Sequence, residues 1–194
     1  TKCNVYFVTP ASCGINDNVK CISTREEMTT LATEVNNGDT KKGKIYYLTS
    51  DIDLGGKFDS DGNALDGNIS WTPLKVFYGI LDGNGHIISN MYINREKISL
   101  NGLIADGGSS IIKNLGIKSS YISGNEIQGA LVGSGNQILN SYVDSDVIIN
   151  GVGRTSGLCG QYCKIKNSYS LATVNNGSVD LTGGLCSGWC TIYN

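Results

Sequence analysis

Residues 157–167 read Gly-Leu-Cys-Gly-Gln-Tyr-Cys-Lys-Ile-Lys-Asn, and residues 184–194 read Gly-Leu-Cys-Ser-Gly-Trp-Cys-Thr-Ile-Tyr-Asn. The two segments begin 27 residues apart and share the opening Gly, a Leu, two Cys, an Ile and the final Asn. The same order of Leu, Ile and Asn, with the Ile two residues before the Asn, occurs in three earlier segments that end at Asn90, Asn114 and Asn140. Successive Asn residues are 24 to 27 residues apart, which indicates a repeat architecture.

The repeat predicts an all-β fold in which each coil of a parallel β-helix takes about 24–27 residues and contains three short strands. Leucine-rich repeats need an apolar residue five positions before the Asn, where this chain has Gly135 and Tyr162. In a β-helix, equivalent residues of successive coils stack about 4.8 Å apart. The alignment predicts an interior Ile ladder and an amide ladder, formed by Ile88, Ile112, Ile138, Ile165 and Ile192 and by Asn90, Asn114, Asn140, Asn167 and Asn194.

One amphipathic helix is expected at about residues 24–36, ahead of the repeats. Ser23 and Thr24 are each followed three residues later by a Glu, so two overlapping capping boxes are present. Met28, Leu31, Ala32 and Val35 form one apolar stripe. We expect this stripe to cover the open end of the solenoid core. The predicted organisation is a Cys-containing N-terminal segment, residues 1–22, and one β-helix domain, residues 23–194, with repeat coils from about residue 75.

Composition excludes several classes of partner. The 194 residues carry a net charge of −2 with no basic run, so we expect no nucleic acid partner. No apolar stretch approaches 18 residues, so we expect no membrane insertion within this chain. Because the last residue falls inside a repeat, the chain is expected to be a fragment that continues into further domains of a longer protein.

Seven cysteines favour an oxidising compartment and are all candidates for disulfides. Cys159 aligns with the inward positions Ile104 and Val132, and Cys163 aligns with Asn136. Three arrangements are open for the repeat cysteines: a bridge within each Cys-x-x-x-Cys turn, bridges between stacked coils, or a zinc site of four thiolates. The odd count leaves one thiol unpaired within this chain. The candidates are Cys3, Cys13, Cys21, Cys159, Cys163, Cys186 and Cys190.

Two groups of acidic residues could carry chemistry. Asp59, Asp61, Asn63 and Asp66 lie within eight residues of a polar loop, residues 55–70, and are candidate calcium ligands, although their order is not that of an EF-hand. We expect no other cofactor. Asp144 and Asp146 would share one face, as a glycoside-cleaving carboxylate pair requires. The register places Lys118 beside Asp144 and puts Asp146 between Ser120 and Thr173, so we expect a solvated, partly paired face without catalytic residues.

The repeats resemble the GLUG-motif repeats of large bacterial surface proteins. The resemblance rests on Gly-Leu-Ile, Ala-Leu-Val-Gly and Gly-Leu-Cys-Gly, on Ile-Lys-Asn-Leu-Gly-Ile, and on the lead-in Tyr-Leu-Thr-Ser-Asp-Ile-Asp-Leu followed by Trp-Thr-Pro. It covers roughly residues 22–194 and departs from the family at the Cys pairs and the acidic loop. It implies a right-handed β-helix of the kind found in adhesins, with no shared catalytic residue.

These observations predict a non-catalytic extracellular or cell-surface module of a bacterial adhesin or exoprotein, which serves as a rigid stalk with a binding face. The expected partner is a glycan or protein on a host or neighbouring cell. The alternative is a carbohydrate-active β-helix that cleaves or binds polysaccharide, because many β-helices do so in a groove on one face.

Overall fold

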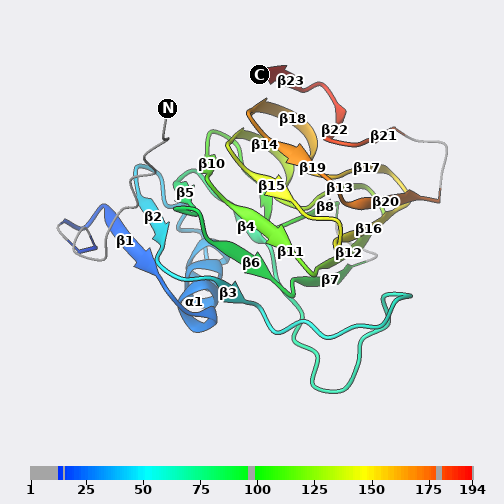
Figure 1. The fold of residues 1–194 in the computed structure, drawn as a ribbon. Helices are drawn as coiled ribbons and strands as arrows, with labels where there is room; N and C mark the ends of the chain where they lie inside the picture. The colour runs from blue at the N-terminus through cyan, green and yellow to red at the C-terminus, as the bar shows by residue number, and fades with distance from the viewer. Residues whose placement is uncertain (1–12, 15, 96–98, 178–180, 194) are drawn as a thin grey trace, which may run out of the picture.

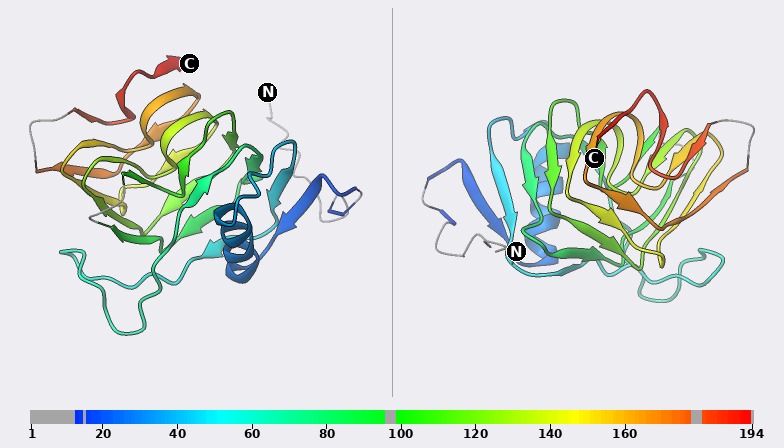
Figure 2. Two further views of the ribbon diagram at one scale, coloured as in Figure 1. Left: turned by 180° about the vertical axis from the view of Figure 1, so that it is seen from behind. Right: turned by 45° about the horizontal axis from the view of Figure 1, so that its top comes forward.

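The computed structural model describes residues 13–14, 16–95, 99–177 and 181–193, so most of the Cys-containing N-terminal segment, including Cys3, lies outside the described residues. Within these described residues the fold is an all-β parallel solenoid of about six turns, with a single short helix near the N-terminus. β1 and α1 lie at one end of the stack, and β22 and β23 lie at the other (Figures 1 and 2). The predicted parallel β-helix is confirmed.

From β5 to β21 each coil passes through four sheets, in which all the paired strands are parallel, where three strands per coil were expected. Most strands have two to four residues, because turns at Gly, Asn and Ser positions bend the chain after every few residues; β14 and β18 have eight. The first sheet contains β1 (Val19–Ile22), β2 (Ile45–Leu48), β4 (Leu74–Val76), β5 (Ile80–Asp82), β9 (Ile104–Asp106), β10 (Ile111–Lys113), β14 (Val132–Leu139), β18 (Cys159–Lys166), β22 (Cys186–Gly188) and β23 (Thr191–Tyr193).

The other three sheets complete the circuit of the coil. The second contains β3 (Ile52–Asp53), β6 (Ile87–Ser89), β11 (Gly116–Lys118), β15 (Tyr142–Val143) and β19 (Tyr169–Ser170). The third contains β7 (Tyr92–Arg95), β12 (Tyr121–Gly124), β16 (Ile148–Gly151) and β20 (Thr173–Asn176). The fourth contains β8 (Leu100–Asn101), β13 (Ile127–Gly129), β17 (Arg154–Ser156) and β21 (Thr182–Gly183).

The helix α1 (Arg25–Asn36) begins with a single capping box. Thr24 accepts a bond from the Glu27 backbone N–H, and the Glu27 carboxylate accepts from the Thr24 backbone N–H, whereas Glu26 pairs with Arg25. The predicted apolar stripe is buried against the core, and α1 packs against β4. Its last residue, Asn36, donates to the Pro73 carbonyl and accepts from the Lys75 backbone N–H. This pair of amide bonds fixes the helix to the coil that contains β4.

The interior ladder of the first sheet consists of Ile112, Ile138 and Ile165, all fully buried, with Ile192 in register beyond them. The prediction was wrong for the earliest coil, because Leu81 rather than Ile88 pairs with Ile112. Ile88 is buried in the second sheet, where it pairs with Ile117. Both residues point inward, and the sequence pattern does not distinguish the two sheets.

The amide ladder follows the same correction. Asn140 donates its side-chain N–H to Asn114 Oδ1 at 3.2 Å, and Asn167 donates to Asn140 Oδ1 at 3.3 Å. All three have a positive φ, between 47° and 53°, which Asn tolerates better than most residues. Asn114 in turn donates to the Asp82 carboxylate, so Asp82 takes the place predicted for Asn90. Asn194 lies outside the described residues.

The loop between β3 and β4 contains the acidic cluster and extends from the side of the stack (Figure 1). Its Phe58 ring stacks on Tyr92, with 5.8 Å between ring centroids, and Tyr92 stacks on Tyr121 at 5.7 Å. The Tyr92 hydroxyl donates to the Gly62 carbonyl. The loop is therefore anchored by an aromatic column on the third sheet.

Candidate functional site

The two Cys-x-x-x-Cys turns are each closed by their own disulfide. Cys159 is bonded to Cys163 and Cys186 to Cys190, with Cα–Cα distances of 6.4 and 6.3 Å. Cys159 and Cys186 pair in register across coils, as the alignment of the repeats predicts, yet each disulfide joins two cysteines of the same coil. The structure thus contains the first of the three arrangements left open by the sequence.

The N-terminal cysteines supply a third bridge, between Cys13 and Cys21, which ties the start of the described chain to β1. Three sulfurs, those of Cys159, Cys163 and Cys190, lie within 4.8 Å of one another. They form the only His, Cys, Asp or Glu cluster of this kind among the described residues. Sulfurs held in disulfides provide no thiolates, which are the form of Cys that binds zinc.

The disulfide turns display two aromatic residues that sequence reasoning did not select. The rings of Tyr162 and Trp189 stack across coils at 5.1 Å and 10°, and the Arg154 guanidinium lies 4.4 Å from the centroid of the Trp189 ring. Arg154 also donates to the Gln161 side-chain oxygen at 2.7 Å. The sequence contains the signal for these residues, because both occupy the repeat position that Gly135 holds one coil earlier.

The carboxylates of Asp144 and Asp146 are both bonded. Lys118 Nζ lies 3.3 Å from Asp144 Oδ2, and Asp144 Oδ1 accepts from the Ser145 backbone N–H. These bonds, the one from Ser145 first and those from Lys118 next, lower the pKa of Asp144 below its ordinary value. A catalytic acid in glycoside cleavage needs the opposite shift.

Asp146 accepts two bonds from Ser119, one from the backbone N–H at 2.8 Å and one from the hydroxyl at 2.7 Å. The predicted position of Asp146 between Ser120 and Thr173 is wrong, since Thr173 pairs with Ile148. The extra residue in this turn lets the carboxylate reach the backbone of the coil below. This geometry gives Asp146 a turn-stabilising role.

The four candidate calcium ligands take different positions in the loop. The Asp59 carboxylate accepts from the backbone N–H groups of Asp61 and Asn63 and from the Asn63 amide. The Asn63 side-chain bond and then the backbone bonds lower the pKa of Asp59. Asp61 and Asp66 are exposed, and the three carboxylates are not gathered within 4.8 Å. Calcium binding here stays a prediction.

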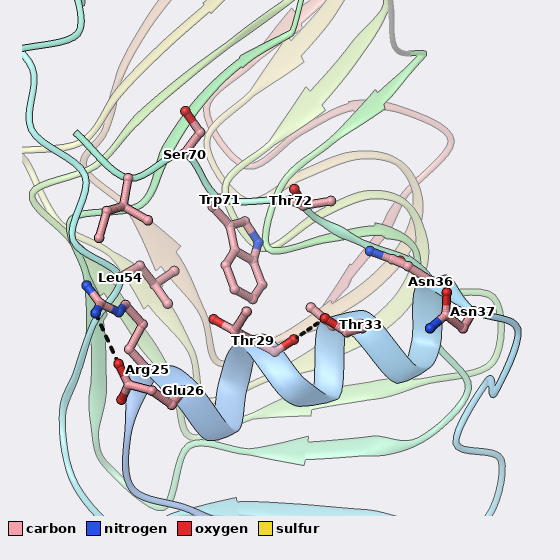
Figure 3. A pocket seen from close by; sticks show the side chains of 12 residues that line it. Arg25, Glu26, Thr29, Thr33, Asn36, Asn37, Leu54, Ser70, Trp71 and Thr72 are labelled. Atoms are coloured by element: carbon pink, nitrogen blue, oxygen red, sulfur yellow. Dashed lines mark hydrogen bonds and ion pairs between the residues drawn. The ribbon is translucent and has the colours of Figure 1, made fainter. Parts of the chain in front are cut away.

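A cavity of about 600 Å³ lies between α1 and the segment that leads into β4 (Figure 3). Trp71 points toward α1 between Thr29 and Thr33, and the Arg25–Glu26 ion pair lies at one end. Trp71 is itself held by a bond from its indole N–H to the Leu103 carbonyl. The lining combines Thr, Asn and Ser side chains and the Arg25–Glu26 pair with the apolar side chains of Ala32, Leu54, Ile69 and Trp71. It contains no nucleophile beside a base.

No family model matches the chain. A stretch of 125 residues, 59% of the chain, is 30% identical to Halomucin from Haloquadratum walsbyi, and this match spans 1% of that protein. The chain also matches a crystal structure of a protein from Bacteroides ovatus that is provisionally assigned as an immunoglobulin A1 protease. The TM-score is 0.57 and the sequence identity is 19%. That match covers 91% of this chain and 60% of the other. At this identity the likeness shows the fold alone.

Proposed function

We propose that this chain is a non-catalytic, extracellular or cell-surface module of a larger adhesin-like protein, serving as a rigid stalk with a binding face. The observation that carries the proposal is the pair of disulfide-closed turns in successive coils. Structural disulfides persist in oxidising surroundings, and a bridge across four residues stiffens the turn in which it lies.

Rigidity along the stack is supported by three interactions that repeat from coil to coil. Parallel backbone ladders connect every coil to the next, the Ile ladder fills the interior, and the amide ladder links the turns. In a solenoid each coil contacts only its neighbours, so such repeated contacts give length without a larger core. Within the described residues, no helix is long and apolar enough to cross a membrane.

A longer array is part of the proposal. The last described coils expose apolar side chains, among them Leu171, Leu181 and Ile192, which further stacked coils would cover. Halomucin supports this view, because a match of 125 residues is only 1% of its length. We infer that modules of this type are used in very long proteins.

The second candidate is a module that cleaves polysaccharide. It is favoured by Asp144 and Asp146, which lie two residues apart and could supply the pair of carboxylates that such cleavage requires. Their bonds to Lys118, Ser145 and Ser119, and the lowered pKa of Asp144, favour a structural role.

Incubation with neutral and acidic polysaccharides, followed by assays for reducing ends and unsaturated products, tests the two candidates. We expect no product above that of heat-denatured protein. Turnover that is lost in Asp144→Asn or Asp146→Asn, but kept in the control Gln137→Glu on the adjoining face, would establish the enzyme and refute the scaffold.

A further inference from the structure

The first sheet carries a column of equivalent residues where the chain bends within β14, within β18 and between β22 and β23. Ser134 pairs with Gln161, and Gln161 with Gly188, so Gly135, Tyr162 and Trp189 take the same position in three successive coils. The preceding coil has Gly108 in this turn, and the Tyr78 ring occupies the space that a Cβ on Gly108 would take. The column thus passes from glycines to two aromatic residues.

The backbone is left-handed at this position in the three coils that contain Gly135, Tyr162 and Trp189, and also at Gly108 in the turn of the coil before, which is two residues longer. Gly108 and Gly135 have φ of 48° and 65°, which cost glycine nothing. Tyr162 and Trp189 have φ of 58° and 49°, where a bulky residue is an outlier that its surroundings must enforce. Folding alone therefore favours glycine here, and the aromatic residues need another explanation.

Exposure shows that these rings are not core residues. Tyr162 is 55% exposed although coils lie on both sides of it, and Trp189 is 62% exposed. The equivalent residue on the other side of Tyr162 is Gly135, which has no side chain to cover that face of the ring. The disulfides Cys159–Cys163 and Cys186–Cys190 hold both rings on stiffened turns.

Polar groups with free bonding capacity lie beside the rings. Arg154 contacts Trp189 and donates one bond to Gln161, which leaves further guanidinium N–H groups, and Gln161 is itself partly exposed. Flat aromatic faces next to planar hydrogen-bonding groups match a pyranose ring. Its C–H groups pack on the negative π face, while its hydroxyls exchange hydrogen bonds at the rim.

We propose that Tyr162 and Trp189, stacked on one another, form a platform whose Tyr162 face toward Gly135 binds a sugar ring of a neutral glycan, with Arg154 and Gln161 bonding the hydroxyls. This inference rests on the proposed extracellular role and specifies its binding face. A nucleic acid base would also stack on these rings, but the net charge of −2 and the absence of a basic run disfavour it.

The test uses affinity electrophoresis in gels that contain laminarin, hydroxyethylcellulose, galactomannan or xylan, together with a printed glycan array. We expect retardation by at least one neutral glycan. Tyr162→Gly and Trp189→Gly should each weaken binding at least tenfold. Both should stay folded, because glycine is the residue that the same turn uses at Gly135. Circular dichroism and a melting curve check this.

Tyr169→Ala is the matched control. Tyr169 is also about half exposed, at 53%, and stacks on Tyr142 across coils at 5.4 Å, but it lies on the second sheet outside the disulfide turns. Its variant should bind like the wild type.

Three results would overturn the proposal. These are no retardation by any glycan, retardation that Tyr162→Gly and Trp189→Gly leave unchanged, and binding of an oligo(dT) probe in place of sugars. Cleavage of the polysaccharide, by contrast, would contradict the non-catalytic role and leave the platform to be judged by the variants alone.

Discussion

Replacing Asn140 by Asp probes the amide ladder with a nearly isosteric change. The Asn140 side chain donates to Asn114 Oδ1 and accepts from Asn167. An ionised carboxylate still accepts from Asn167 but has no hydrogen to donate, so two oxygens face one another on the Asn114 side. Asp also tolerates the positive φ of this position, so backbone strain does not confuse the result.

The expected loss in the free energy of unfolding at pH 7 is about 1–2 kcal/mol, the net value of one hydrogen bond plus the facing oxygens. For a domain of this size that corresponds to a fall in Tm of roughly 2–8 °C. Acid should reverse the loss. The neutral carboxyl can donate to Asn114 again, so the folded chain raises the pKa of the new group above its unfolded value of about 3.9. The deficit is therefore present above the raised pKa and disappears as the pH falls below about 3.9.

Urea unfolding of wild type and variant at pH 7 and pH 3 provides the measurement. Gln137→Glu lies on β14, the strand that ends just before Asn140, and its exposed side chain is outside the ladder. It adds the same charge and should change stability by less than about 0.5 kcal/mol. A deficit in Asn140→Asp no larger than in this control, or one that persists at pH 3, would refute the amide ladder.

Three further perturbations address the interior, the turn and the loop. Ile138→Ala leaves a cavity at a fully buried position of the Ile ladder and should lower the free energy of unfolding, measured in urea, by about 2–5 kcal/mol. A loss below about 1 kcal/mol would contradict the ladder. Replacing both Cys159 and Cys163 by Ser should lower the free energy of unfolding by about 2 kcal/mol, since the bridge closes only a short loop. Calorimetry with and without reductant measures the loss, and an unchanged Tm would refute the bridge. The pKa of Asp59, measured by NMR titration, should lie below the ordinary Asp value, because the bonds to its carboxylate favour the charged form. Asp59 therefore stabilises the loop above the ordinary pKa of about 3.9 and loses that effect as the pH falls through its lowered pKa. A pKa that is not lowered would contradict the bonded loop.

The repeat itself could be predicted from sequence because inward Ile residues and turn Asn residues recur at nearly constant spacing. The error at Ile88 and Asn90 has a physical cause. Both Ile88 and Ile112 are inward residues of three-residue strands, but they belong to different sheets. Alternation of buried and exposed residues gives the side of the sheet on which a residue lies and contains no information on which sheet of the coil it occupies.

The site was less accessible to sequence reasoning. The pairing of β14 with β18 confirms that Cys159 aligns with Val132 and Cys163 with Asn136. This stacking permits bridges within a turn and bridges between coils, and only the geometry of the folded turn shows that the bridge lies within it. The sequence aligns Tyr162 with Gly135 but gives no reason to treat it as a binding residue, because an aromatic residue in a turn is unremarkable in composition. It stands out only once the backbone at this position is known to be left-handed, at Gly135 as well as at Tyr162.

Mass-spectrometric mapping of peptides digested without reduction tests most directly the claim that each of the two Cys-containing coils closes its own turn. Cys159 linked to Cys163, and Cys186 linked to Cys190, is the predicted result. A bridge from Cys159 to Cys186, or four free thiols in protein purified from an oxidising compartment, would contradict it.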